Sequence, residues 1–326
     1  MNTGLWLVVA LLALWVVAKR VKVHYRVQTS LRMAAPEAQV LAAITDFEQW
    51  PHWSPWLMHE PDCILRFQNP TEVGGHYDWD GQRIGAGRIT HLSRPDAHTI
   101  PTELQFLRPF KAKALATLTV RALNADECDV QWTMDGALPV FMAPMRRLMS
   151  EMLTKDFELG LAHLAGYLNP QAEHPVITFE STMERPSFHA VTQRESTTLS
   201  QLPEVFNRLL ADLATRAGDA VCDAPMGVYH RINPKSGAVD MEVALPVAEF
   251  TPGATLVRGG HYARTTLRGN YRFIQLAWHA AYGQARMNKH KWDAQSPALE
   301  RYVVGPDQTP DSNAWVTELY LPVKEK

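Results

Sequence analysis

The sequence predicts an α+β protein with three parts. They are an N-terminal transmembrane helix, a domain whose sheet curls around one long helix, and a second domain built from two copies of a β-α-β-β unit. Three observations carry this prediction. The chain starts with an apolar run from Leu5 to Ala18. Strand-like alternation later gives way to a long amphipathic helical pattern at 139–168. A short phrase then occurs twice, as DMEVALPV at 240–247 and VTELYLPV at 316–323.

The composition excludes several classes of protein. A chain of 326 residues is long enough for two domains and an appendage. Its net charge of −2 and pI near 6.7 show no basic excess, so we expect no nucleic acid partner. Cys63, Cys128 and Cys222 lie far apart and outside any CxxC spacing, which predicts buried thiols and no disulfide framework. The histidines form no HExxH motif, so we expect neither a metal nor another cofactor.

Residues 1–22 are predicted to form a transmembrane anchor. The apolar run of Leu5–Ala18 is followed at once by Lys19, Arg20 and Lys22. A secretory signal would carry its positive charges before the run and a cleavage site after it. The positive-inside rule places the remainder in the cytoplasm, so we expect a single-pass inner-membrane protein. A buried N-terminal helix is the alternative.

Residues 23–168 are predicted to form the first domain. Alternation over 23–35 predicts a strand, and a helix begins near Pro36. Several strands follow within 62–134, separated by glycine- and asparagine-containing turns. In the helical pattern at 139–168 an apolar stripe is expected to line a cavity against the sheet. The stripe consists of Phe141, Met145, Leu148, Met152, Leu161 and Leu164.

Trp53 and Trp56 flank Pro55 in a predicted turn of this domain. We expect them to lie at the rim of the cavity, where they could also touch the membrane interface that tryptophan favours.

Residues 169–175 are the predicted linker, and 176–326 the second domain. One β-α-β-β unit cannot bury its apolar face alone, so the two copies should form a pseudo-two-fold domain with a cleft at their seam. The expected strands are 176–181, 187–194, 227–233, 239–247, 255–266, 299–304 and 315–323, and the expected helices are 199–217 and 270–288.

The first half resembles the START-like superfamily, in its polyketide cyclase/dehydrase and lipid-transport branch, over about 24–168. The resemblance is carried by DFEQWPHWSPW (46–56), Gly85 and Gly87, LRPF (107–110), VQWTMDG (130–136) and DFELGLAHL (156–164). It implies a helix-grip fold and a cavity for an apolar ligand or lipid.

The second half resembles the gyrase-inhibitor-like effector-binding domain, which is also found in multidrug-sensing transcription activators, over about 176–326. The resemblance is carried by PMGVYHRI (225–232), HYARTTLRGNY (261–271), PALERYVVGPDQTP (297–310) and VTELYLPV (316–323). It implies a cleft for amphipathic or cationic small molecules and a buried glutamate on a late strand, which Glu318 matches. The implied aromatic wall consists of Tyr302, Tyr320, Trp278 and Tyr229. The activators carry an N-terminal helix-turn-helix region. In this chain the START-like domain and the predicted anchor occupy that place, so DNA binding is not implied.

The acidic residues of the second half are the candidate ligand-binding groups. On a strand, Glu318 and Tyr320 share one face, and a carboxylate among aromatic rings suits an organic cation. A solvent-facing carboxylate is the alternative. Glu242 holds the equivalent place in the first copy. Glu300 alternates with Tyr302 and is either a second acid of the cleft or a surface residue paired with a neighbouring base.

The sequence therefore predicts a membrane-anchored small-molecule binding protein with an apolar cavity and an acidic aromatic cleft. Two alternatives stay open. One is a hydrolase of small xenobiotic compounds, in which Glu318 acts as base toward water and Glu300 as a second acid. The other is a lipid carrier with a regulatory sensor domain. The sequence shows no constellation of nucleophile and base, so no catalytic residue is assigned.

Overall fold

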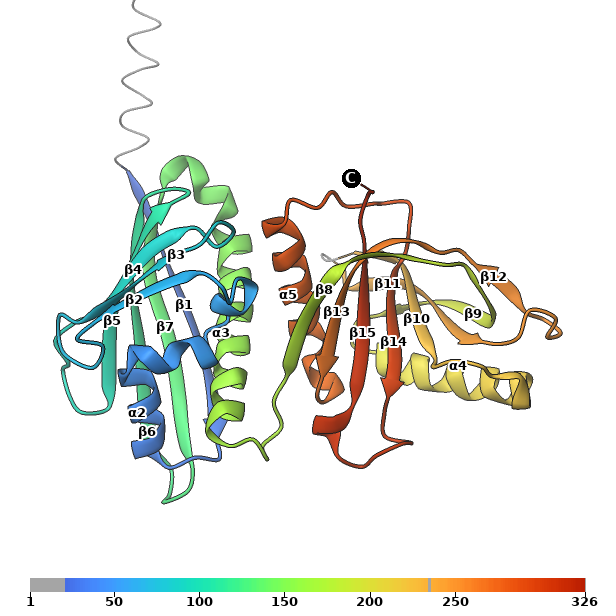
Figure 1. Cartoon of the computed structure of the whole chain (residues 1–326), viewed down its shortest axis with the longest axis horizontal. Helices are drawn as coiled ribbons and strands as arrows, with labels where there is room; N and C mark the ends of the chain where they lie inside the picture. The colour runs from blue at the N-terminus through green and yellow to red at the C-terminus, as the bar shows by residue number, and fades with distance from the viewer. Residues whose placement is uncertain (1–20, 234–235, 326) are drawn as a thin grey trace, which may run out of the picture. The chain divides into compact units, whose positions relative to one another are not determined.

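The computed structural model describes residues 21–233 and 236–325, and the chain divides into two compact units (Figure 1). We call Met1–Ala172 the first domain and Glu173–Lys326 the second domain. Each is an antiparallel sheet with few helices.

The predicted N-terminal transmembrane helix needs correction. Residues 1–20 lie outside the described residues. The end of the predicted anchor belongs to the sheet, because Val21 accepts a backbone hydrogen bond from Val140 at 3.0 Å and Lys22 pairs with Pro139. No helix in the described ranges is long and apolar enough to cross a membrane. This finding corrects both the predicted transmembrane helix and the predicted single-pass inner-membrane location.

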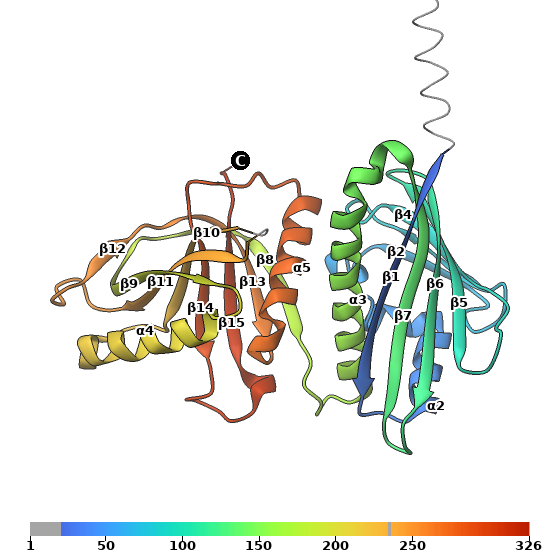
Figure 2. The same ribbon diagram turned by 180° about the vertical axis from the view of Figure 1, so that it is seen from behind.

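The first domain is a seven-stranded sheet in the order β1-β7-β6-β5-β4-β3-β2. Its strands are β1 (Lys22–Met33), β2 (Ile64–Gln68), β3 (His76–Asp80), β4 (Ala86–His91), β5 (Thr99–Arg108), β6 (Ala112–Ala122) and β7 (Cys128–Pro139). Its helices are α2 (Glu37–Thr45), η1 (Phe47–His52), η2 (Leu57–His59), η3 (Val140–Met145) and α3 (Arg146–Leu168). The long helix α3 packs against β1 and β7, the strands at one end of the sheet order (Figure 2).

Aromatic rings fill the space beside α3. Phe157 of α3 stacks on Trp132 of β7, with ring centroids 4.4 Å apart. Trp50 and Trp53 pack beside them, and the ring centroids of these two tryptophans lie 4.7 Å apart. All four side chains are at most 2% exposed. Trp53 is therefore a core residue and does not lie at a rim, in contrast to the sequence prediction. Trp56 is half-buried and meets Trp132 edge-on.

The predicted apolar stripe of the long helix divides into two parts. Leu161 and Leu164 are buried in the core, whereas Phe141 and Leu148 are 59% and 57% exposed. Pro144 lies inside η3, so the segment before α3 is a short 3₁₀ helix and does not continue the α-helical face.

The second domain is an eight-stranded sheet in the order β12-β9-β11-β10-β14-β15-β13-β8. Its strands are β8 (Val176–Arg185), β9 (Phe188–Thr198), β10 (Met226–Ile232), β11 (Ala238–Pro246), β12 (Thr255–Val257), β13 (Gly260–Arg268), β14 (Ala298–Val304) and β15 (Val316–Pro322). Its helices are α4 (Leu202–Ala217), η4 (Gly218–Ala220), η5 (Tyr271–Phe273), α5 (Ile274–Met287) and η6 (Ser312–Ala314).

The strand order of the second domain shows its duplication. One copy runs β9-α4-β10-β11 and the other runs β13-α5-β14-β15. The copies meet where β10 pairs with β14, from Met226 opposite Arg301 to Tyr229 opposite Ala298. On either side of this seam the strands follow in equivalent order. Helix α4 packs on β9 and β11, and α5 packs on β13 and β15.

Candidate functional site

Strand β14 sends its side chains to two faces of the second sheet. Glu300 and Tyr302 lie on the helix face, since Glu300 contacts Trp278 of α5 and Tyr302 contacts Phe206 of α4. Arg301 points the other way, to the face we call the open face. It pairs with Glu318 of β15, which therefore lies on the open face as well. The predicted site residues thus form clusters on opposite faces.

On the helix face, Glu300 accepts three hydrogen bonds. They come from Tyr229 Oη at 2.7 Å, Trp278 Nε1 at 2.6 Å and Tyr302 Oη at 2.5 Å. We call these four residues the Glu300 cluster. Glu300 is only 5% exposed. Its three donors come from β10, α5 and β14, and each of them is a neutral group.

The phenols of this cluster are held in their protonated form. Burial raises the pKa of Tyr229 and of Tyr302 well above the ordinary value, and the charge of Glu300 acts in the same direction. Both hydroxyls therefore remain donors. Phe206 packs on Tyr302 at a centroid distance of 4.8 Å, which extends the apolar surround.

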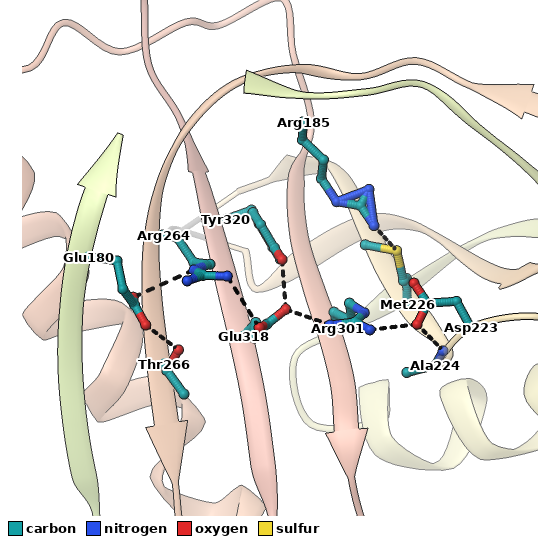
Figure 3. Close-up of polar contacts among 10 residues, drawn as sticks. All are labelled: Glu180, Arg185, Asp223, Ala224, Met226, Arg264, Thr266, Arg301, Glu318 and Tyr320. Carbon is teal, nitrogen blue, oxygen red and sulfur yellow. Dashed lines mark hydrogen bonds and ion pairs between the residues drawn. The ribbon is translucent and has the colours of Figure 1, made fainter. Parts of the chain in front are cut away.

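On the open face, Glu318 lies among permanent positive charges (Figure 3). It accepts hydrogen bonds from Tyr320 Oη at 2.6 Å and Arg301 Nη1 at 2.9 Å, and Arg264 Nη1 lies 3.5 Å away. Arg301 also donates to Asp223 at 2.5 Å, and Arg264 lies 3.8 Å from a carboxylate oxygen of Glu180. Carboxylates and guanidinium groups thus alternate across the sheet, from Glu180 of β8 through β13, β15 and β14 to Asp223 before β10.

The pKa of Glu318 reflects this arrangement. Burial alone would raise it, but the hydrogen bonds from Tyr320 and Arg301 and the charges of Arg301 and Arg264 lower it overall. Both carboxylates beside Arg301 raise the pKa of its guanidinium, against the effect of its burial. Glu318 is therefore an ionised group whose charge two arginines already compensate.

Glu242 lies apart from both clusters. It is two residues before Ala244, which packs with Tyr320 on the open face, so Glu242 faces the same side. Its Oε2 atom lies 2.9 Å from His230 Nε2, and this contact is the main cause of its lowered pKa.

Sequence reasoning left two alternatives for Glu300, a second acid of the cleft or a surface residue paired with a neighbouring base, and the structure places it buried among aromatic donors. Another feature was missed by sequence reasoning. The arginines of the open face were not singled out, although the two-residue period of β14 places Arg301 opposite to Glu300. In the described part of the chain, no group of three or more His, Cys, Asp or Glu side chains could hold a metal ion.

Comparisons with solved structures give weak similarities. The crystal structure of the EcmrR C-terminal domain is 16% identical, with 45% of this chain and 99% of that chain covered at a TM-score of 0.40. The ZhuI aromatase/cyclase from Streptomyces sp. R1128 is 12% identical, with coverage of 46% and 96% and a TM-score of 0.37. An EcmrR–DNA complex is 16% identical, with coverage of 57% and 72% and a TM-score of 0.39. No curated protein matches the chain.

Family comparisons are more informative. Residues 24–169 match the family described as polyketide cyclase / dehydrase and lipid transport. Residues 182–324 match the family described as GyrI-like small molecule binding domain. The two matches have the order that the sequence motifs predict. The chain therefore joins a domain of the polyketide cyclase/dehydrase and lipid transport family to a GyrI-like domain, and both are small-molecule binding folds.

Proposed function

We propose that the second domain binds an organic cation, or an amphipathic molecule with a cationic group, and that Glu300 is its anionic partner. One observation carries the proposal: Glu300 is 5% exposed, and its three hydrogen-bond donors are all neutral. A buried carboxylate is costly unless a cation compensates its charge. A ligand cation would supply that compensation.

The rings around Glu300 suit the same ligand. Aromatic faces attract organic cations, most strongly when water is excluded. Trp278 is half-buried and packs beside Tyr282, which in turn stacks on Trp292 with centroids 5.7 Å apart. Tyr282 and Trp292 are 44% and 45% exposed, so a row of aromatic rings leads from Glu300 to the surface.

The prediction that Glu318 binds the ligand stays a prediction. A cation at Glu318 would compete with Arg301 and Arg264, which already contact both of its carboxylate oxygens. Glu300 has no such competitor among its three donors, and the geometry therefore favours Glu300.

The test uses two ions of nearly equal shape and opposite charge, tetraphenylphosphonium and tetraphenylborate. Calorimetric titration of the full chain should show preferential binding of the phosphonium ion. Glu300→Gln keeps the size of the side chain and removes its charge. It should weaken phosphonium binding by roughly thirty-fold, which corresponds to about 2 kcal/mol.

Glu195→Gln is the matched control, because Glu195 is paired with Arg208 at the surface of the same domain. It should leave the affinity unchanged. Equal affinities of wild type and Glu300→Gln would overturn the proposal. A larger loss in Glu318→Gln than in Glu300→Gln would move the site to the open face. Mass spectrometry of an electrophilic cationic ligand after incubation would reveal the hydrolase alternative through a converted product.

For the first domain we propose an apolar ligand that carries a hydrogen-bond acceptor. The Nε1 atoms of Trp53 and Trp132 are buried without a hydrogen-bond partner in the part of the chain that the structure describes. Such donors are costly to leave unsatisfied. Solvent extraction of the purified chain followed by mass spectrometry should recover a lipid-like molecule, and Trp132→Phe should reduce its amount. Equal recovery from both proteins, or no recovery from either, would contradict this assignment.

A further inference from the structure

In the described part of the chain Arg185 has no carboxylate within ion-pair distance, in contrast to Arg264 and Arg301 on the same face. Its Nη2 atom donates to Met226 Sδ at 3.1 Å (Figure 3). Its Cζ atom lies 4.5 Å from the ring centroid of Phe188 and 5.3 Å from that of Tyr320. Sulfur is a weak hydrogen-bond acceptor, and the face of an aromatic ring offers no directional hydrogen-bond acceptor. Most of the five N–H donors of Arg185 are therefore available to a ligand.

The two other arginines in Figure 3 each lie between two carboxylates, although their Nε atoms have no hydrogen-bond partner among the described residues. Arg301 lies between Glu318 and Asp223, and Arg264 lies between Glu318 and Glu180. For Arg185 the described residues provide no carboxylate within ion-pair distance. Burial lowers its pKa, because the cation loses hydration that the protein does not fully replace.

A second donor near Arg185 is also unsatisfied. Tyr262 is 0% exposed, and its hydroxyl has no hydrogen-bond partner among the described residues. Its ring meets Tyr320 edge-on at a centroid distance of 6.0 Å. Burial raises the pKa of Tyr262 to about 12, while the charge of Arg185 acts in the opposite direction, as expected for a nearby cation. A buried hydroxyl of this kind calls for an acceptor.

We propose that Arg185 and Tyr262 form a binding site for the carboxylate of a small organic acid. The planar guanidinium would hold the carboxylate through paired hydrogen bonds, as arginine does elsewhere. Tyr262 would donate a further bond, and the apolar body of the acid would lie on Phe188 and Tyr320. The site is on the open face and does not depend on the role proposed for Glu300.

The charges nearby select a monoanion. On this face Glu180, Asp223 and Glu318 carry three negative charges, and Arg185, Arg264 and Arg301 carry three positive charges, of which only that of Arg185 lacks a carboxylate within ion-pair distance among the described residues. A bound carboxylate would add one negative charge directly beside Arg185. The second charge of a phosphate monoester would meet repulsion from these carboxylates. A carboxylate is therefore the expected head group.

The test compares naphthalene-2-carboxylate with its neutral amide by calorimetric titration of the full chain. Wild type should bind the carboxylate more tightly than the amide. Arg185→Met keeps most of the stem and removes the charge, and it should weaken carboxylate binding by at least tenfold while changing amide binding less than twofold. Arg185→Lys keeps the charge without the planar fork and should show an intermediate loss. Arg208→Gln, which removes a surface-paired arginine of the same domain, should bind as wild type does.

Hydrogen exchange locates the bound acid. Added carboxylate should slow exchange in the peptides that contain Arg185 and Tyr262, and Tyr262→Phe should weaken binding severalfold. Unchanged carboxylate affinity in Arg185→Met overturns the proposal, as does protection confined to the first domain. Tighter binding of naphthyl phosphate than of the carboxylate would contradict the monoanion argument. Retained amide binding shows that a variant with lost carboxylate affinity is still folded.

Discussion

Glu300 and Arg301 are adjacent in the chain, yet their side chains lie on opposite faces of one sheet and in opposite electrostatic surroundings. Glu300 accepts hydrogen bonds from neutral aromatic groups, whereas Arg301 bridges Glu318 and Asp223. The period of two in a strand makes this possible. One strand thereby contributes to a buried acid on the helix face and to an ion-pair network on the open face.

Removal of Glu300 should destabilise the second domain. Glu300→Ala leaves the hydroxyls of Tyr229 and Tyr302 and the indole N–H of Trp278 without their acceptor. Each unsatisfied buried donor costs about 1–3 kcal/mol, so we expect a loss of several kcal/mol. Tyr229→Phe removes one donor only and should cost about 1 kcal/mol. Hydrogen exchange of β14 amides measures both losses, and equal effects would show that the three bonds do not act together.

Replacement of Arg301 should be costly because it leaves two carboxylates uncompensated. Arg301→Met removes the partner of Glu318 and Asp223, whose side chains are 14% and 39% exposed. Since the pairs are partly screened, we expect a loss of about 1–3 kcal/mol in urea unfolding. Arg194→Gln breaks a more exposed pair with Asp240 and should cost less than about 1 kcal/mol. A similar cost for both variants would mean that burial does not strengthen the Arg301 pairs.

The lowered pKa of Glu318 predicts a pH dependence of stability. A carboxyl whose pKa is lower in the folded state than its ordinary value of 4.5 contributes stability that is fully present above that value. The contribution is lost as the pH falls through the lowered pKa. Wild type should therefore lose stability more steeply than Glu318→Gln as the pH falls below about 4.5. Urea unfolding at several pH values measures both slopes, and parallel curves would contradict the assignment.

The aromatic core of the first domain gives a further prediction. Phe157→Ala removes the ring that stacks on Trp132 and should cost about 3–5 kcal/mol through lost packing and the cavity left behind. Phe141→Ala is the matched control because Phe141 is 59% exposed, and its effect should stay within about 0.5 kcal/mol. Urea unfolding followed by tryptophan fluorescence measures both. A small effect at Phe157 would show that the domain closes around the missing ring.

The division of strand residues between faces could be predicted from the sequence, whereas their partners could not. Alternation predicted that Glu318 and Tyr320 share one face, and in the structure both lie on the open face. The neighbour of Glu318 depends on the register between β14 and β15, which the intervening loop sets. The period of a strand does not encode that register.

The surroundings of Glu300 depend on contacts between distant parts of the chain. Tyr229 is 71 residues away and Trp278 is 22 residues away. An isolated glutamate in a strand is most often exposed, so local sequence favours the surface. The break before α3 has a local cause in Pro144, which a helical periodicity count overlooks.

The Glu300 cluster spans the seam between β10 and β14, where the two copies of the repeated unit meet. Tyr229 belongs to one copy of the repeated unit and Glu300 to the other, so their hydrogen bond ties the two halves of the domain together. The contact between Phe206 and Tyr302 crosses the same boundary. A ligand that replaces the Tyr229 hydroxyl as a partner of Glu300 would remove one of these contacts between the two copies. Ligand binding at Glu300 would then loosen the packing between the copies and let one copy rotate relative to the other.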